Sequence, residues 1–212
     1  MNTPTIGIFM LLATVGLLVL AAAVLVHARI TKRPTPWRPV LWTTGGWVAV
    51  YLAVLLATSL TSDERVLDIA QDKKFCGFYL DCHMQVAVTG VDTVREIGLR
   101  RANGVFYVVT LRVSSDAVRA RLNLIAPQLV LRDAAGRRYD QVPTNPGVET
   151  LAREIGPEES FNSTLVFDVP EDATDLRLHV SMGFWVDRLI EAVLIGDEDS
   201  ILHKRTSFRI AA

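Results

Sequence analysis

Two long apolar runs begin the chain, and a short basic stretch separates them. Neither run, Ile6–Ala28 or Val40–Leu60, contains a lysine, an arginine, an aspartate or a glutamate. As α-helices they would be roughly 34 and 31 Å long, and the hydrocarbon core of a bilayer is about 30 Å thick. We therefore expect residues 1–60 to form a two-helix transmembrane anchor in the lipid bilayer, with helices over about 6–28 and 40–60.

A buried soluble helix and a cleaved targeting signal are the alternatives. Two uncharged runs of this length are rare in soluble domains, and the second run is longer than the apolar part of a usual signal peptide. That run does follow a basic segment and ends near Ala57-Thr58-Ser59, which resembles a cleavage site. We expect both helices to be retained.

The basic stretch sets the predicted orientation. It carries Arg29, Lys32, Arg33 and Arg38, whereas no lysine or arginine precedes Ile6. Because short loops rich in lysine and arginine stay on the cytoplasmic side, both ends of the chain are expected outside. The sequence thus predicts a two-pass protein of a bacterial cytoplasmic membrane, with its N-terminus and its C-terminal domain on the extracytoplasmic side.

Small residues recur at every fourth position of the second run, at Gly45, Ala49, Ala53 and Ala57. They form a stripe along which another helix can approach closely. We expect the first helix to pack there. Self-association and docking to another membrane protein are the alternatives.

The hydrophobic period changes after the second run. Residues 61–75 are polar with a weak helical rhythm and are expected to form a stalk. From Met84 onward, apolar and polar residues alternate in short runs typical of half-buried strands. These runs lie at 84–89, 105–113, 128–131, 138–142, 161–169, 176–180 and 208–210.

Short strands separated by turn signals predict an all-β antiparallel sandwich over residues 76–212. One segment of this region is ambiguous. Residues 186–195 fit either a helix or a strand, and a strand is favoured for Ala192–Ile195.

Three stretches of this region together resemble a known family. They are the strand Phe106–Val109, the hairpin Leu131–Tyr139, and Ile155–Ser160 with the strand that follows to Pro170. They resemble the bacterial extracytoplasmic immunoglobulin-like domains of unknown function, related to the mycobacterial immunoprotective secreted antigen, over roughly residues 84–182.

This resemblance implies a seven-strand immunoglobulin-like sandwich outside the cytoplasm, without enzymatic activity or catalytic residues. The chain departs from the usual member because it has two membrane helices instead of one lipidated cysteine. Residues 76–83 and 183–204 also lie outside the matching pattern, so a specialised role is expected in one of them.

The chain has two cysteines, Cys76 and Cys82, and His83 follows the second. In an oxidising extracytoplasmic compartment, a disulfide between them is the expected state. The alternative is a metal or redox site that uses both thiols and His83, which are soft donors suited to Cu(I) or zinc. Such a site needs a further ligand, such as His179 or His203, and two free thiols are a third alternative.

Other signs of chemistry are weak. The acids of Gly196–Ser200 lack the spacing of an EF-hand loop, so a solvated turn is expected rather than a calcium site. We find no nucleophile elbow, phosphate-binding loop, zinc-protease motif or dinucleotide fingerprint. The net charge of -1 gives no field that would hold nucleic acid. We therefore expect no catalysis, no cofactor, no bound metal and no nucleic-acid partner.

The favoured function is a membrane-anchored binding or scaffold protein of the bacterial cell envelope, whose partner is a protein or an envelope component. Aromatic residues outside the clearest strands are candidate contacts, namely Phe78, Tyr79, Phe184 and Trp185. The alternatives are the metal or redox domain described above and a subunit of a membrane protein complex whose helices carry the function.

Overall fold

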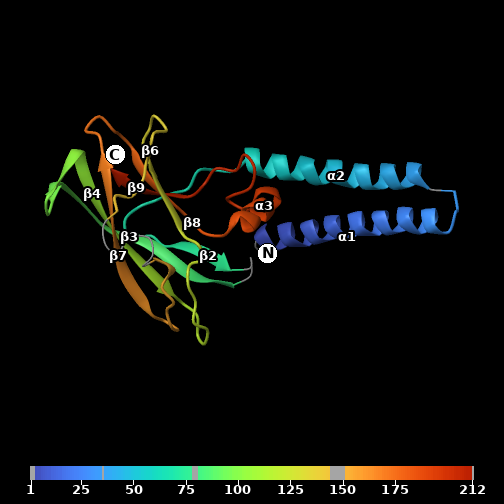
Figure 1. The fold of residues 1–212 in the computed structure, drawn as a ribbon, viewed down its shortest axis with the longest axis horizontal. Coiled ribbons are helices and arrows are strands. Elements are labelled where there is room, and N and C mark those ends of the chain that lie inside the picture. The colour runs from blue at the N-terminus through green and yellow to red at the C-terminus, as the bar shows by residue number, and fades with distance from the viewer. Residues whose placement is uncertain (1–2, 35, 78–80, 144–150, 212) are drawn as a thin grey trace. The chain divides into compact units, whose positions relative to one another are not determined.

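The computed structural model describes residues 3–34, 36–77, 81–143 and 151–211. The chain divides into two units, which we call the helical unit and the sandwich unit. The helical unit comprises Met1–Asp63 and Asp187–Lys204, and the sandwich unit comprises Glu64–Val186 and Arg205–Ala212. Three covalent crossings therefore connect the units. Figure 1 shows their helices and strands along the chain.

Two antiparallel helices form most of the helical unit (Figure 1). α1 spans Thr3–Ile30 and α2 spans Trp37–Leu60. The parts Ile6–Ile30 and Trp37–Leu60 are long and apolar enough to cross a membrane, a property that signal sequences share. α2 begins before the expected residue 40 because Pro39 is tolerated in the first turn of a helix, where its missing N–H is not needed.

The two helices contact each other along a repeat of about seven residues. The less exposed positions of α1 include Gly7, Thr14, Ala21 and Ala28, and those of α2 include Thr44, Val48, Tyr51 and Leu55. Spacings of three and four residues bring these positions onto one side of each helix, as in left-handed helix pairs. A polar contact lies in the same face, where the Trp47 indole Nε1 donates to Thr14 Oγ1 at 2.9 Å.

The sandwich unit consists of two sheets. The five-stranded sheet has the order β1-β9-β8-β5-β6, and the four-stranded sheet has the order β2-β3-β4-β7. The strands are β1 Val66–Leu67, β2 Lys73–Gly77, β3 Asp81–Ile97, β4 Arg100–Ser115, β5 Gln128–Arg132, β6 Arg138–Tyr139, β7 Ser160–Val169, β8 Leu176–Ser181 and β9 Ser207–Ala211. The expected two-sheet sandwich is confirmed.

Two details of the sandwich differ from the expected pattern. The described residues form nine strands rather than seven, and β1 runs parallel to β9, whereas the other pairings are antiparallel. β1 is two residues long, which is too short to show the alternation by which strands are found in a sequence.

The core lies between the sheets and follows from the alternation along the strands. In β8, Leu176, Leu178 and Val180 are buried, while the residues between them are half-exposed. Side chains from both sheets complete the core, and Phe167 of β7 and Phe208 of β9 are fully buried in it.

The predicted stalk over residues 61–75 is not what the structure has, because β1 and the start of β2 lie in this segment. Leu67 and Phe75 are 3% and 6% exposed and belong to the core of the sandwich. The sandwich unit thus begins at Glu64, before the expected residue 76. These few apolar residues lie among many charged ones, and for that reason the segment resembled a linker.

The prediction of a strand at Ala192–Ile195 is wrong. Residues Trp185–Val193 form the helix α3, and Leu194 and Ile195 follow it as buried residues outside any strand. The helical spacing of the apolar residues was therefore the better guide. The segment also groups with the two long helices rather than with the sandwich.

Candidate functional site

The two cysteines form a disulfide between β2 and β3, as expected, and the described residues hold no free cysteine. Both thiolates of the alternative metal site are consumed by this bond. His83 follows in β3, and its Nδ1 lies 2.6 Å from Asp116 Oδ1. Among the described residues, no three histidine, cysteine, aspartate or glutamate side chains gather as a metal site would require. Phe78 and Tyr79 of this loop lie outside the described residues.

The Asp116 carboxylate interacts with three polar side chains on the surface of the sandwich. Besides His83, its carboxylate accepts hydrogen bonds from Gln85 Nε2 at 2.7 Å and from Lys74 Nζ at 3.2 Å. The hydrogen bonds from His83 and Lys74 lower the pKa of Asp116. The cluster lies in solvent, with about half of the His83 side chain exposed. It therefore holds β2, β3 and the segment after β4 together, and it lacks the enclosure of a catalytic site.

Replacing both cysteines with serine is expected to destabilise the sandwich by about 2 kcal/mol, because the bond closes a short loop in the unfolded chain. The measurement is urea unfolding of the full chain in detergent, with reduction of the unmodified chain as the matched control. Thiol titration of the unreduced chain should find no free thiol. Two free thiols, or equal stability of the variant, would contradict this expectation.

The stripe of Gly45, Ala49, Ala53 and Ala57 does not face α1, so the expected packing within the hairpin is wrong. All four residues are exposed, and the side of α2 that contacts α1 carries Tyr51 and Leu55 instead. Met10 and Leu11 of α1 pack against the cluster that contains Tyr51 and Leu55. Self-association through the stripe, or docking to another membrane protein, remains a prediction.

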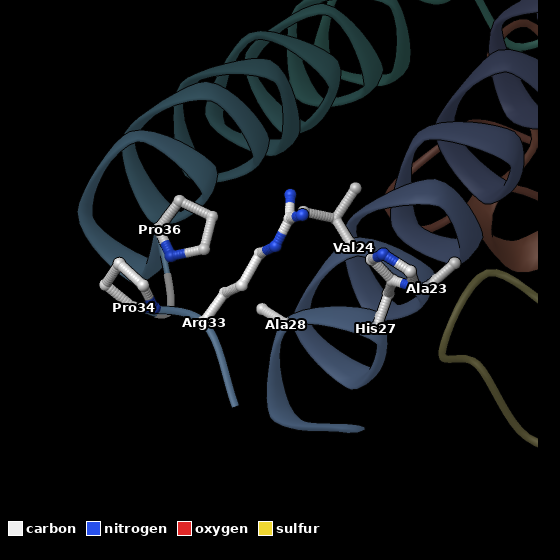
Figure 2. A pocket seen from close by; sticks show the side chains of 7 residues that line it. All are labelled: Ala23, Val24, His27, Ala28, Arg33, Pro34 and Pro36. Atoms are coloured by element: carbon white, nitrogen blue, oxygen red, sulfur yellow. The ribbon is translucent and has the colours of Figure 1, made fainter. Parts of the chain in front are cut away.

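An open cavity of about 430 Å³ lies between α1 and α2 beside their connecting turn. Figure 2 shows Arg33 directed from the turn into this space, with Val24 and His27 on the α1 side and Pro36 on the α2 side. Arg33 and His27 are the only ionisable side chains of its described lining. The described lining residues include neither a nucleophile nor an orienting partner for the imidazole.

The acidic segment 196–200 is a half-buried turn rather than the expected solvated one. Asp197 Oδ1 accepts a hydrogen bond from Asp199 N at 2.8 Å, and Ser200 Oγ donates to Asp197 O at the same distance. Burial raises the pKa of Asp197 to about 6. One carboxylate oxygen of Asp197 is thus bonded within its own turn, and these contacts do not form a calcium site.

Glu191 of α3 belongs to the same acidic group. Burial raises the pKa of its carboxyl to about 7, and the charges of Asp197, Asp199 and Asp187 act in the same direction. Its Oε2 is buried and has no hydrogen-bond partner among the described residues. At a pH between 4.5, the ordinary pKa of the carboxyl, and about 7, Glu191 is protonated in the packed segment and ionised in the unfolded chain. Its packing therefore weakens as the pH rises through this window.

The variant Glu191→Gln is expected to reduce this pH dependence, since an amide stays uncharged, and the part that comes from Asp197 remains. Hydrogen exchange of residues 187–204 in the full chain at pH 5 and pH 8, corrected for intrinsic rates, measures the effect. The unmodified chain should be better protected at pH 5 than at pH 8, and the variant should match it at pH 5 and lose less protection at pH 8. Equal protection of both chains at pH 8 would show that Glu191 does not control the packing.

Four arginines form a row across the outer face of the five-stranded sheet. Strand pairing places Arg209 of β9 beside Arg177 of β8, Arg177 beside Arg132 of β5, and Arg132 beside Arg138 of β6. Directly paired residues project on the same face of a sheet, and the residues next to these arginines point into the core. At about 4.8 Å between strands, the row is roughly 14 Å long. We call it the arginine row.

Carboxylates neutralise only part of this row. Arg177 pairs with Glu64 and with Asp175, and Arg209 lies 3.2 Å from Asp68. Arg132 and Arg138 have no hydrogen bond or ion pair from their side chains within the described part of the chain. Like charges directly opposite one another destabilise a sheet. Arg132 and Arg138 therefore add positive charge that no carboxylate of the described residues neutralises.

His179 lies on the same face of β8, two residues from Arg177. Burial lowers the pKa of its imidazole to about 4, and the charges of Arg132, Lys73 and Arg205 lower it further. The ring is therefore neutral at pH 7, so the positive charge of this face comes from the guanidinium groups.

Residues 81–190, just over half of the chain, match the model of a family described as a domain of unknown function. The chain belongs to the DUF4352 family. The expected membership of a family of unknown function is thereby confirmed for the DUF4352 domain, and two apolar helices precede this domain. None of the curated proteins matches this chain significantly.

Three solved structures are similar to this DUF4352 chain at low identity. A secreted protein from Mycobacterium tuberculosis, MPT63, is 12% identical with a TM-score of 0.45 and covers 70% of this chain and 99% of its own. A conserved hypothetical protein from Bacillus anthracis is 18% identical with a TM-score of 0.38, covering 53% and 89%. An uncharacterized β-sandwich protein from Clostridium difficile is 12% identical with a TM-score of 0.37, covering 71% and 97%.

Sequence reasoning about this DUF4352 chain missed the arginine row and the packing of residues 187–204 on the helices. Each arginine was visible in or beside an expected strand, but the row depends on the register of four strands that are far apart in the sequence. The helical spacing of residues 185–193 was visible too. Its partners, Tyr51 and Gly7, lie more than a hundred residues away.

Proposed function

We propose that this protein is a membrane-anchored binding protein whose sandwich lies outside the cytoplasm and binds an anionic component of the cell envelope along the arginine row. The arginine row is the observation that carries the proposal. Neither the disulfide nor the cavity between the helices offers a comparable set of ligand-binding groups. The scaffold role and the absence of catalysis are parts of the same proposal.

The extracytoplasmic location is supported by two independent features. Arg29, Lys32, Arg33 and Arg38 lie in or beside the turn between the two apolar helices, and the first acidic residue of the chain is Asp63. A basic turn of this kind favours the cytoplasmic side, and this supports a sandwich on the other side. The disulfide between Cys76 and Cys82 suits that side, because cytoplasmic thiols are kept reduced.

The geometry of the row favours an extended ligand over a compact one. Guanidinium groups form paired hydrogen bonds with phosphates and carboxylates. Four of them in a straight line across a sheet complement a polymer that carries an anionic group every few ångströms. The two arginines without carboxylate partners, Arg132 and Arg138, are adjacent and lie at one end of the row.

The proposal is tested with the full chain in nanodiscs of a zwitterionic phospholipid. The probe is a fluorescent long-chain polyphosphate, and a neutral dextran of similar length is the control. We expect the polyphosphate to bind, its affinity to fall as salt rises, and the dextran not to bind. Absence of polyphosphate binding at low salt would refute an anionic partner. The basic turn is also accessible in nanodiscs, so variants of the arginine row assign the binding.

A further inference from the structure

α3 exposes its apolar side. Trp185 and Leu189 are 73% and 60% exposed, and Val186 and Val193 are exposed as well. With 3.6 residues per turn, these four positions lie on one side of the helix. The segment after the helix adds Ile201 and Leu202, which are also exposed.

The opposite side of α3 is polar and turned inward. Glu191 lies there, half-buried, and one of its carboxylate oxygens is buried with no hydrogen-bond partner in the part of the chain that the structure describes. A helix on the surface of a soluble protein has the reverse arrangement, with its apolar side against the core. The observed arrangement is stable where the surroundings of the exposed side are themselves apolar.

Contacts place α3 and the residues after it at one end of the helix pair. The Tyr51 hydroxyl donates to Val193 O at 2.5 Å, and Ser59 Oγ lies 3.3 Å from Ser200 Oγ. A Cβ at Gly7 would lie 2.1 Å from Ile195 O, so only glycine allows this approach. Gly7 is near the start of α1 and Ser59 is near the end of α2, so both lie away from the basic turn. Figure 1 shows α3 beside these ends.

These contacts also set a depth along the helices. Tyr51 is nine residues before the end of α2 at Leu60, which is about 14 Å along a helix axis. The C-terminal end of α3 is thus bonded to a residue inside the candidate membrane span rather than to its tip. Ile195 packs with Tyr51 and Leu55 in the same small apolar cluster.

We propose that α3, with Ile201 and Leu202, lies in the outer leaflet of the bilayer and contacts the acyl chains through its exposed apolar side. The inference extends the proposed anchor and is independent of the arginine row. The occupant is the phospholipid bilayer because the segment is packed on the two helices that cross it. The chain then enters the membrane surface twice, once before its DUF4352 domain and once at the end of that domain.

Bromolipid quenching of Trp185 tests this proposal. A full chain with Trp37→Phe, Trp42→Phe and Trp47→Phe keeps Trp185 as its one tryptophan. It is reconstituted in vesicles of phosphatidylcholine brominated at defined acyl positions. We expect strong quenching that is greatest for bromine near the headgroup, and little quenching by aqueous iodide. A matched variant keeps only Trp42, which is 81% exposed on α2, as the positive control.

Each outcome decides the proposal. Quenching of Trp42 without quenching of Trp185 would overturn it and leave the two-helix anchor intact. Protection of Trp185 from iodide without bromolipid quenching, together with a doubled molecular mass, would assign the surface to a second copy and also overturn it. Quenching of neither tryptophan would overturn the anchor as well. In the otherwise unmodified chain, Trp185→Phe should reduce the quenching by bromine near the headgroup, to which Trp37 at the start of α2 still contributes, and this comparison guards against misfolding of the triple variant.

Discussion

The double variant Arg132→Glu and Arg138→Glu is expected to bind polyphosphate about 100-fold more weakly than the unmodified chain. Each lost charge-assisted hydrogen bond contributes about 1.5 kcal/mol, and two of them amount to roughly 3 kcal/mol, or about a hundredfold in affinity. Both arginines are exposed and without carboxylate partners in the described part of the chain, so their replacement breaks no ion pair. Fluorescence anisotropy of the labelled polyphosphate in nanodiscs measures the change.

The matched control is Arg101→Glu with Arg119→Glu. These arginines are exposed on the same unit, outside the five-stranded sheet, and their replacement changes the net charge equally. We expect this control to bind within about threefold of the unmodified chain, because only a general field effect is lost. An equal loss in both double variants would contradict the row as the binding surface and indicate nonspecific attraction.

The same double variant should fold at least as stably as the unmodified chain. Arg132→Glu replaces a like-charge pair with Arg177 by an opposite-charge pair, and such cross-strand changes contribute roughly 0.2–1 kcal/mol. Loss of binding together with retained or increased stability would separate a ligand-binding role of the arginines from a structural one. A proportional loss of both would indicate damage to the sandwich.

Replacing Phe167 with alanine is expected to destabilise the sandwich unit by about 3–5 kcal/mol, because truncation of a buried phenylalanine removes contacts and leaves a cavity. Phe167 is fully buried on β7, where it pairs with Tyr107 of β4. A domain of this size is stable by about 5–15 kcal/mol, so the variant loses a large fraction of its stability. Urea unfolding of the full chain in detergent, monitored by the β-sheet signal in circular dichroism, measures the free energy of unfolding of the sandwich unit.

The control for this variant is Thr164→Ala on the same strand. Thr164 is exposed, so we expect a change of no more than about 0.5 kcal/mol. Comparable losses from Phe167→Ala and Thr164→Ala would contradict the assignment of the core between the two sheets.

The sequence was sufficient to predict the elements whose pattern is local. The uncharged runs predicted α1 and α2, and alternation predicted most of β4, β5, β7 and β8. The sequence was not sufficient to predict β1. Its two residues show no period, and they pair with β9, which is more than a hundred residues away in the sequence. The small-residue stripe failed for a related reason, because a sequence pattern does not specify which side of α2 meets α1.

The candidate site shows the same limit. The disulfide followed from two cysteines in an expected oxidising compartment, and it is present. The arginine row depends on the register between β9, β8, β5 and β6, which local patterns do not determine. The inverted packing of α3 could not be predicted from the sequence either. Its partners on the long helices are distant in sequence, and its apolar side has the same pattern as one that faces a core.

Reporter fusions at the C-terminal end of the sandwich determine on which side of the membrane it lies. Alkaline phosphatase, which is active after export, and green fluorescent protein, which fluoresces in the cytoplasm, are each fused after Ala212 of the full chain in a bacterial host. The account predicts an active phosphatase fusion and a dark fluorescent fusion. An inactive phosphatase with bright cytoplasmic fluorescence would contradict it, because the sandwich and its arginine row would then face the cytoplasm.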